Sequence, residues 1–254
     1  MFLAISVLMV FWQVYLLNIN KSMRTNKEYK KAALAALKGN WAQSVVATAS
    51  VLFLSVILNL ILIGIDYMMI KGVFGYDPWV TYAVSVLTIL VSLLFLFFLA
   101  FPLVIAFANA FSRLYYKSDR AVLSNVKEML FEDTLHGSVG MFAMGLITGL
   151  FSLALVIPGI IASMSLFLTP YLLKDYPKLS IVDTLRLSRK MMKGHKMQLF
   201  LLQLSFIGWI LLNVLTLGLA SLWITPYMMT AFAAFYHDVK EQYIMKEGQQ
   251  ESAL

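Results

Sequence analysis

Four long stretches of this sequence carry no charged residue, and they constrain the fold more than any other feature. They are Trp41–Ile65, Trp79–Ser112, Gly137–Leu173 and Met197–His237, with histidine counted as neutral. A helix needs about 20 residues to cross the hydrocarbon core of a bilayer. The first two stretches predict one membrane span each. The third and fourth are too long for one crossing even with tilt, so each predicts a hairpin, which makes six spans in all.

Proline and glycine predict where these helices turn or bend. The third stretch contains Ile157-Pro158-Gly159, where proline interrupts the hydrogen-bond ladder and glycine permits a reversal. The fourth is expected to turn near Leu215-Thr216-Leu217-Gly218. In the second stretch, Phe101-Pro102 predicts a kink in a helix that then continues to Ser112.

The composition agrees with a lipid environment. Of the 254 residues, 61% are hydrophobic and only 13% are charged. Soluble domains contain about 45–50% apolar and about 25% charged residues. The sequence contains no cysteine, which excludes disulfides, thiolate metal sites and thiol catalysis.

The distribution of lysine and arginine supports the six-span topology. Alternating the loops places residues 21–40, 113–136, 174–196 and the tail after 238 on one side of the membrane. That side then holds 19 of the 20 basic residues, and only Lys71 lies on the other. The positive-inside rule makes this the cytoplasmic side, which includes the C-terminus.

Three cytoplasmic segments have the pattern of amphipathic helices lying in the headgroup layer. Thr25 and Glu28 form a capping-box pattern before the first, and Ser180 and Asp183 give a similar start to the last. A shorter apolar repeat follows residue 121. The basic residues of the first and last segments are candidate lipid-headgroup contacts: Lys27, Lys30, Lys31, Lys38, Arg186, Arg189, Lys190, Lys193 and Lys196.

A surface helix followed by a hairpin occurs three times, which predicts an internal repeat with units of about 25–117, 118–178 and 179–240. Matching motifs support the repeat. Lys38-Gly39-Asn40-Trp41 corresponds to Lys193-Gly194-His195-Lys196, and Thr169-Pro170-Tyr171 corresponds to Thr225-Pro226-Tyr227. The expected fold is all-α, a single membrane domain over 23–240 with a polar cytoplasmic tail over 241–254.

Residues 1–22 leave two alternatives open. Met1–Leu17 is apolar apart from Gln13 and is close to the minimum spanning length, so it predicts a seventh span. The alternative is a misassigned start, with Met23 as the natural first residue ahead of the first surface helix. A secretory signal is not expected, because a basic n-region and a small-residue cleavage site are both absent.

These motifs resemble a bacterial integral-membrane family catalogued as domain of unknown function 975. The resemblance covers about 23–240, and residues 1–22 lie outside it. His195 stands where asparagine is expected. The residues that carry the resemblance, all expected to be structural, are Gly39, Asn40, Trp41, Pro158, Gly159, Pro170, Tyr171, Gly194, Ser205, Gly208, Trp209, Gly218, Pro226 and Tyr227. The family is distantly similar to the membrane region of some glycerophosphodiester phosphodiesterases. The resemblance implies a bacterial cytoplasmic membrane and supplies no activity.

Searches for catalytic chemistry find nothing specific. Nucleotide-binding glycine loops, His-Glu-x-x-His and Gly-x-Ser-x-Gly are absent from the sequence. The histidines His136, His195 and His237 lie at expected span ends, where an interfacial role is favoured over a metal site. We therefore expect a protein that is not an enzyme and has no cofactor. Because the basic helices have apolar faces, anionic lipid is favoured over nucleic acid as their partner.

Three functions remain open at this level. The first is a membrane protein that binds lipid headgroups, or a membrane-protein partner, through its basic helices. The second is a transporter or channel for a neutral or amphipathic solute, suggested by the repeat, the prolines and the amide side chains within the spans. Such amides are more often hydrogen-bonding links between helices. The third is an accessory to a lipid-processing enzyme, suggested only by the phosphodiesterase similarity.

Overall fold

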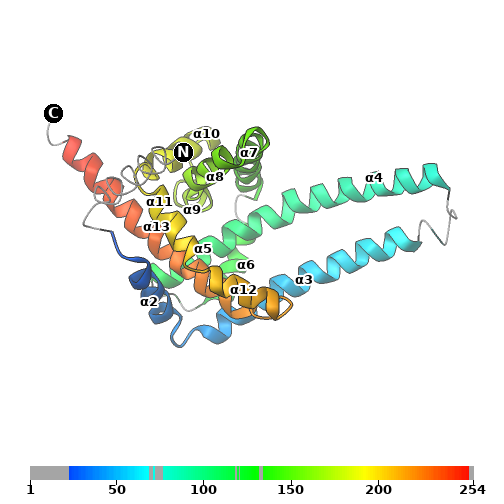
Figure 1. Cartoon of the computed structure of the whole chain (residues 1–254), viewed down its shortest axis with the longest axis horizontal. Coiled ribbons are helices and arrows are strands. Elements are labelled where there is room, and N and C mark those ends of the chain that lie inside the picture. The colour runs from blue at the N-terminus through cyan, green and yellow to red at the C-terminus, as the bar shows by residue number, and fades with distance from the viewer. Residues whose placement is uncertain are drawn as a thin grey trace, which may run out of the picture.

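The computed structural model describes residues 23–68, 71, 77–117, 119, 121–131 and 134–251, and all regular secondary structure among them is helical. Residues 1–22, with the alternatives open for them, lie outside the described part of the chain. The helices, labelled as in Figure 1, are α2 (Asn26–Leu37), α3 (Trp41–Tyr67), α4 (Pro78–Phe95), a π-helical turn (Leu96–Ala100), α5 (Phe101–Lys117), α6 (Val122–Phe131), α7 (Thr134–Ala154), α8 (Val156–Leu166), α9 (Thr169–Asp175), α10 (Ile181–Met191), α11 (Lys196–Leu204), α12 (Ile207–Leu215) and α13 (Ser221–Glu251).

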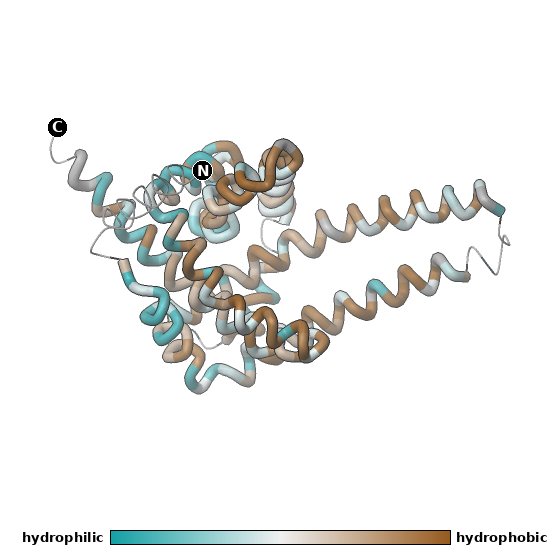
Figure 2. The backbone as a smooth tube through the Cα atoms, viewed as in Figure 1, coloured by the Kyte–Doolittle hydropathy of each residue, from teal (hydrophilic) through white to brown (hydrophobic). Residues whose placement is uncertain are grey.

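Helices α3 and α4 extend side by side away from the rest of the molecule (Figure 1). The 27 residues of α3 give a length of about 40 Å at 1.5 Å per residue. Most residues along the outer part of α3 are hydrophobic (Figure 2), and Leu60 there is 63% exposed. A helix that is apolar all round and uncovered by protein requires lipid as its solvent.

Within the described part of the chain, five helical segments are long and apolar enough to cross a membrane. They are Trp41–Ile65, Trp79–Lys117, Thr134–Leu153, Val156–Asp175 and Lys196–Leu215. The expected sixth span coincides with α13, which does not belong to this set. Its apolar first half runs directly into Asp238, Lys240 and Glu241, so no window of spanning length is apolar enough. The arrangement of six spans in three hairpins is therefore not confirmed, and the supported class is an all-helical protein with several candidate spans.

The hairpin of α7 and α8 turns earlier than the sequence predicts. The reversal lies at Leu155, which has an extended backbone, and α8 already begins at Val156. Pro158 occupies the first turn of α8, where proline is tolerated because the first amides of a helix have no intrahelical partner. Gly159 is buried against α7: a Cβ atom there would lie 2.8 Å from the Cα of Ser152. The glycine thus allows two helices to pack closely and does not form the turn.

The other proline and glycine predictions have mixed outcomes. The helix bearing Pro102 continues, as expected, with the π-helical turn Leu96–Ala100 just before it. Proline lacks the N–H that would bond four residues back, which accounts for the wider turn. The turn predicted near Leu215–Gly218 is confirmed: α12 ends at Leu215, and Leu217 and Gly218 have φ angles of 51° and 92°.

Helix α13 is the centre of the packed region, and α2, α3, α5 and α12 all contact it. From Thr230 to Tyr236 every residue of α13 is buried. Aromatic rings fill this core: Phe235 packs edge-on against Tyr29 of α2 at 5.8 Å, and Tyr236 stacks on Tyr171 of α9 at 4.6 Å.

The first surface helix therefore differs from the expectation of a helix lying in the headgroup layer. Its capping box is confirmed, with the Thr25 side chain accepting from the Glu28 amide and the Glu28 carboxylate accepting from the Thr25 amide. Its apolar face, however, is covered by protein, because Tyr29, Ala33 and Leu37 are fully buried.

Two of the motifs that suggested a repeat share one backbone conformation. Gly39 and Gly194 both have positive φ angles, 83° and 92°, in the linker between a surface helix and the next helix. Glycine adopts this left-handed conformation without a steric penalty. The threonine-proline motifs differ, since a helix break precedes Pro170 whereas Pro226 lies inside α13. The threefold repeat stays a prediction.

Gly159→Ala is expected to destabilise the protein, because the new methyl group would meet the backbone of Ser152 and push α7 and α8 apart. Overpacking of this kind costs about 1–3 kcal/mol. Thermal unfolding in detergent measures the effect. Gly149→Ala is the matched control: it lies on α7 with open space around its Cβ position. Equal unfolding temperatures for the two variants would show that the close approach at Gly159 is unimportant.

Candidate functional site

The basic residues predicted on α2 fall into two groups. Lys27, Lys31 and Lys38 are exposed. Lys30 instead donates a hydrogen bond to the carbonyl of Ser205, and its Nζ lies 4.5 Å from the centre of the Phe206 ring. This carbonyl lies at the break between α11 and α12. Lys30 therefore links α2 to that break. The outward-facing charges are Lys27 and Lys31 of α2 and Lys38 directly after it.

The basic residues predicted on α10 and after it lie around the expected stripe, but protein covers this stripe, as it covers the apolar face of α2. Leu185, Ser188 and Met192 are buried, and the Ser188 hydroxyl donates to the carbonyl of Ser165 on α8 at 3.1 Å. This contact fixes α10 against α8. Around the stripe, Arg186, Arg189, Lys190 and Lys193 are exposed and Lys196 is half-buried. Arg186 pairs with Asp183 one turn earlier, at 3.2 Å.

Arg189 and Lys196 share a groove that is otherwise mainly apolar. This groove, called the α8 groove below, has a volume of about 280 Å³. Its other lining residues are Ile147 and Phe151 of α7 and Pro158, Ile161, Ala162, Ser165 and Leu166 of α8. From Pro158 to Leu166 the helix rises about 12 Å. The Ser188–Ser165 hydrogen bond places the adjacent Arg189 near the Leu166 end of this wall.

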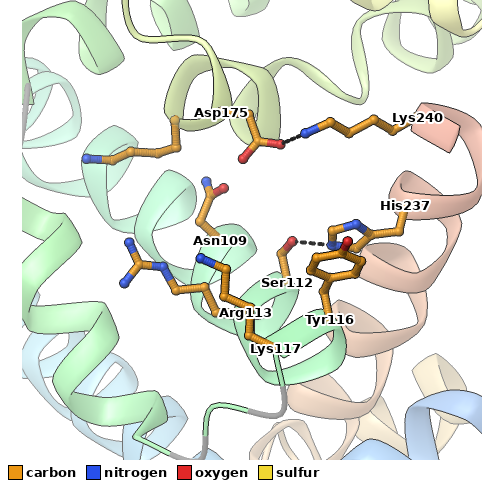
Figure 3. Close-up of a pocket in the computed structure, with 9 residues that line it drawn as sticks. Asn109, Ser112, Arg113, Tyr116, Lys117, Asp175, His237 and Lys240 are labelled. Atoms are coloured by element: carbon orange, nitrogen blue, oxygen red, sulfur yellow. Dashed lines mark hydrogen bonds and ion pairs between the residues drawn. The ribbon is translucent and has the colours of Figure 1, made fainter. Parts of the chain in front are cut away.

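A second site, missed by the sequence analysis, lies between α5, α9 and α13 (Figure 3). This α5–α13 cavity has a volume of about 360 Å³. It is lined by Asn109, Ser112, Arg113, Tyr116, Lys117, Lys174, Asp175, His237 and Lys240. Four basic side chains thus face one carboxylate, so the cavity has the electrostatic character of an anion site.

The one carboxylate in the lining already has partners. Asp175 accepts hydrogen bonds from the hydroxyl of Tyr236 and from Nζ of Lys240, and both reach it from α13. Asn109 forms the wall below, where its amide donates to the carbonyls of Ile105 and Pro170 at 2.9 and 2.8 Å. These bonds tie α9 to both α5 and α13 and define the cavity.

His237 and Ser112 lie at a separation that would suit a nucleophile and its base. The Ser112 hydroxyl lies 2.8 Å from Nε2 of His237, whose ring stacks on Tyr116 at 4.6 Å. Burial lowers the pKa of His237 to about 4, an effect that outweighs the nearby Asp175. An imidazole with so low a pKa is a weak base at neutral pH, and Asp175 is bound to other partners. The geometry favours anion binding over nucleophilic chemistry.

A third basic pocket, of about 500 Å³, is formed where the end of α10 meets the end of α13. Lys190, Lys193 and Lys246 line it together with Glu247 and the buried His195. Burial lowers the pKa of His195, with a smaller contribution from Lys246. His195 and His237 thus line different cavities. Among the described residues, no group of three or more His, Cys, Asp or Glu side chains is placed to hold a metal ion.

Three of the amide side chains that suggested a solute path, those of Asn109, Gln198 and Asn59, donate hydrogen bonds to backbone carbonyls. Asn109 bridges α5 and α9, and Gln198 donates to the carbonyl of Arg24 at 2.8 Å. Asn59 donates to Ser55 within its own helix. The bonds of Asn109 and Gln198 join separate segments and are of the kind that holds helices together, whereas the bond of Asn59 is internal to α3.

The remaining residues that carried the family resemblance lie in structural positions. Asn40, Pro170 and Tyr171 are buried, and Trp209 packs edge-on against Tyr227 at 5.9 Å. None of the residues in this group lines the α5–α13 cavity. The cavity residues come from three distant segments, so no local motif could reveal them. Their only sequence signal is that Arg113, Lys117, Lys174 and Lys240 closely follow the ends of uncharged stretches.

The uncharged helices, the candidate spans and the concentration of basic residues together define a multispan helical membrane protein. Within that class, the chain belongs to the family described as protein of unknown function (DUF975), whose model matches residues 78–243. The family resemblance seen in the sequence is thereby confirmed, although Gly39, Asn40 and Trp41 lie outside the matched segment. No curated protein and no solved structure matches the chain.

The environment of His237 predicts a pH dependence of stability. Its pKa is lower in the folded protein than the usual value of 6.5, so folding favours the neutral ring. This contribution to stability is complete above about pH 6.5 and is lost as the pH falls towards 4. His237→Gln should therefore lose less stability than the wild type between pH 7 and pH 4. Thermal unfolding in detergent across this range checks it, and parallel curves for both proteins would contradict it.

Proposed function

We propose that this protein is a non-enzymatic membrane protein whose basic face binds anionic lipid headgroups, with the α8 groove as the principal lipid site. The observation that carries the proposal is the joining of an apolar wall to Arg189 and Lys196 in one groove. An anionic phospholipid has the matching chemistry, with an apolar chain attached to a phosphate.

The two parts of the groove contribute in different ways. Each basic residue near an anionic membrane surface contributes about 1 kcal/mol of electrostatic attraction. This attraction alone would not distinguish one basic surface from another. The apolar wall supplies the distinction, because an acyl chain lying along α8 can pack against Phe151 and Ile161, which are half exposed.

The exposed lysines of α2 extend this basic face and are proposed as further headgroup contacts. We place the face on the cytoplasmic side of a bacterial membrane, because basic loops are retained there during insertion. The C-terminal end of α13 lies on the same side, because its Lys240 reaches Asp175 at the end of α9, near Arg113 and Lys117 at the end of α5. The uncovered sides of α3 and α4 provide a surface for a membrane-protein partner, since they are apolar and unburied.

Lipid selectivity in nanodiscs tests this function. Nanodiscs containing equal amounts of phosphatidylcholine and phosphatidylglycerol are assembled with the protein, and the lipids retained after delipidation are quantified by mass spectrometry. The wild type should retain phosphatidylglycerol preferentially. Arg189→Gln/Lys196→Gln should reduce the preference about tenfold or more, since it removes about 2 kcal/mol of attraction.

Two controls separate the groove from general surface charge. Lys127→Gln/Lys178→Gln removes two charges from exposed positions that are not proposed as headgroup contacts and should have a smaller effect. Ala162→Phe fills the groove while leaving both charges in place and should reduce the retention as well. Equal retention of the two lipids by the wild type would refute lipid binding, and an unaltered preference in Ala162→Phe would refute the groove as the site.

A further inference from the structure

The α5–α13 cavity contains more positive charge than its carboxylates balance. We propose that it is a second anion site, which recognises a phosphate group. This site goes beyond the proposed function, because it shares no residue with the α8 groove. Three observations support the proposal: the basic side chains in the lining, the bonds that already engage nearby carboxylates, and the size of the cavity.

Arg113 and Lys117 form the core of the site. One turn apart on α5, they reach into the same opening below Asn109 (Figure 3). Like charges that share one opening repel each other, and an anion between them removes that repulsion. The planar guanidinium of arginine binds two phosphate oxygens at once, and lysine adds a point charge. Lys174 and Lys240 add positive charge from α9 and α13.

The three carboxylates near the cavity offset only part of its positive charge, and hydrogen bonds engage two of them, Asp175 and Asp119. Tyr236 and Lys240 both donate to the same oxygen of Asp175, Oδ2, and Lys240 lies across the opening from Arg113 (Figure 3). The oxygens of Asp119 accept from the Asn125 side chain and the Ala121 amide, at 2.9 and 3.0 Å. Glu128 approaches Arg113 only to 3.9 Å and is 55% exposed. Such an exposed pair contributes little, typically 0–1 kcal/mol, so an incoming anion can replace it.

The chemistry of the lining selects the type of anion. A phosphate monoester carries about 1.5 to 2 negative charges at pH 7 and offers three strong acceptor oxygens, which suit two adjacent basic groups. A carboxylate carries one charge and would leave the second group unbalanced. The volume of about 360 Å³ lies in the range of small-molecule sites, about 300–1,000 Å³, so the phosphate can carry a substituent. Tyr116 and His237, stacked on each other, form a flat wall for it.

The phosphate could belong to a soluble molecule or to a lipid headgroup, and the experiment has an arm for each. In the first, inorganic pyrophosphate is titrated into the full-length protein in a neutral detergent and binding is followed by calorimetry. In the second, the protein is placed in phosphatidylcholine nanodiscs with or without phosphatidate, and the retained lipid is measured. Binding in the first arm identifies a soluble ligand, and retention of phosphatidate alone identifies a headgroup.

The variants Arg113→Gln and Lys117→Gln should each weaken binding about tenfold, the effect of removing one charge-assisted hydrogen bond. Lys117 is exposed at the end of α5, so its replacement keeps the test valid if Arg113→Gln disturbs folding. Lys178→Gln removes one exposed charge elsewhere and should leave binding unchanged. Ala162→Phe should also leave it unchanged, which separates this site from the α8 groove.

Three results would overturn the proposal. The first is no binding of pyrophosphate at millimolar concentration together with no preference for phosphatidate. The second is binding that both Arg113→Gln and Lys117→Gln leave unaltered. The third is equal weakening by Lys178→Gln, which would mean that only overall charge matters.

Discussion

The packed region of this protein depends on the middle of α13, which other helices cover on all of its sides. From Thr230 to Tyr236 every side chain is covered, so α2, α5 and α9 must all lie against this segment. Burial of the large rings of Phe235 and Tyr236 contributes strongly to this packing, because aromatic side chains remove large apolar areas from water. The polar end of α13 then emerges next to the ends of α5 and α9. The α5–α13 cavity is a direct result of that crowding.

The sequence predicts those parts of the fold that depend on local or compositional signals. The uncharged stretches correspond to helices, and the Thr25 capping box forms. Leu185 and Ser188 share one face of α10, as the helical spacing predicts. The reversal at Leu155 was placed too late, because proline is acceptable in the first turn of a helix as well as in a turn. The span expected at α13 is not confirmed, and the sequence alone does not decide it, because apolar residues buried in protein and apolar residues facing lipid look alike in a sequence.

The candidate sites show the same division. The predicted basic residues of α10 lie on the surface as expected, because an amphipathic helix specifies its own exposed face. Lys30 could not be distinguished from its neighbours, since its partner Ser205 is 175 residues away. Arg113 and Lys117 of α5 meet Asp175 of α9 only through tertiary packing, and the resemblance to a family without a known activity gives them no role.

The double attachment of Asp175 has a mechanical consequence. Tyr236 and Lys240 hold α9 to α13 one turn apart, so the two helices cannot slide independently at this level. Helix α13 continues for 31 residues, about 46 Å, from the turn after α12 to its charged end, with Pro226 in its interior. Asp175 lines the cavity from α9, and His237 and Lys240 line it from α13. The same two bonds that join the helices therefore fix the separation of two of the cavity walls.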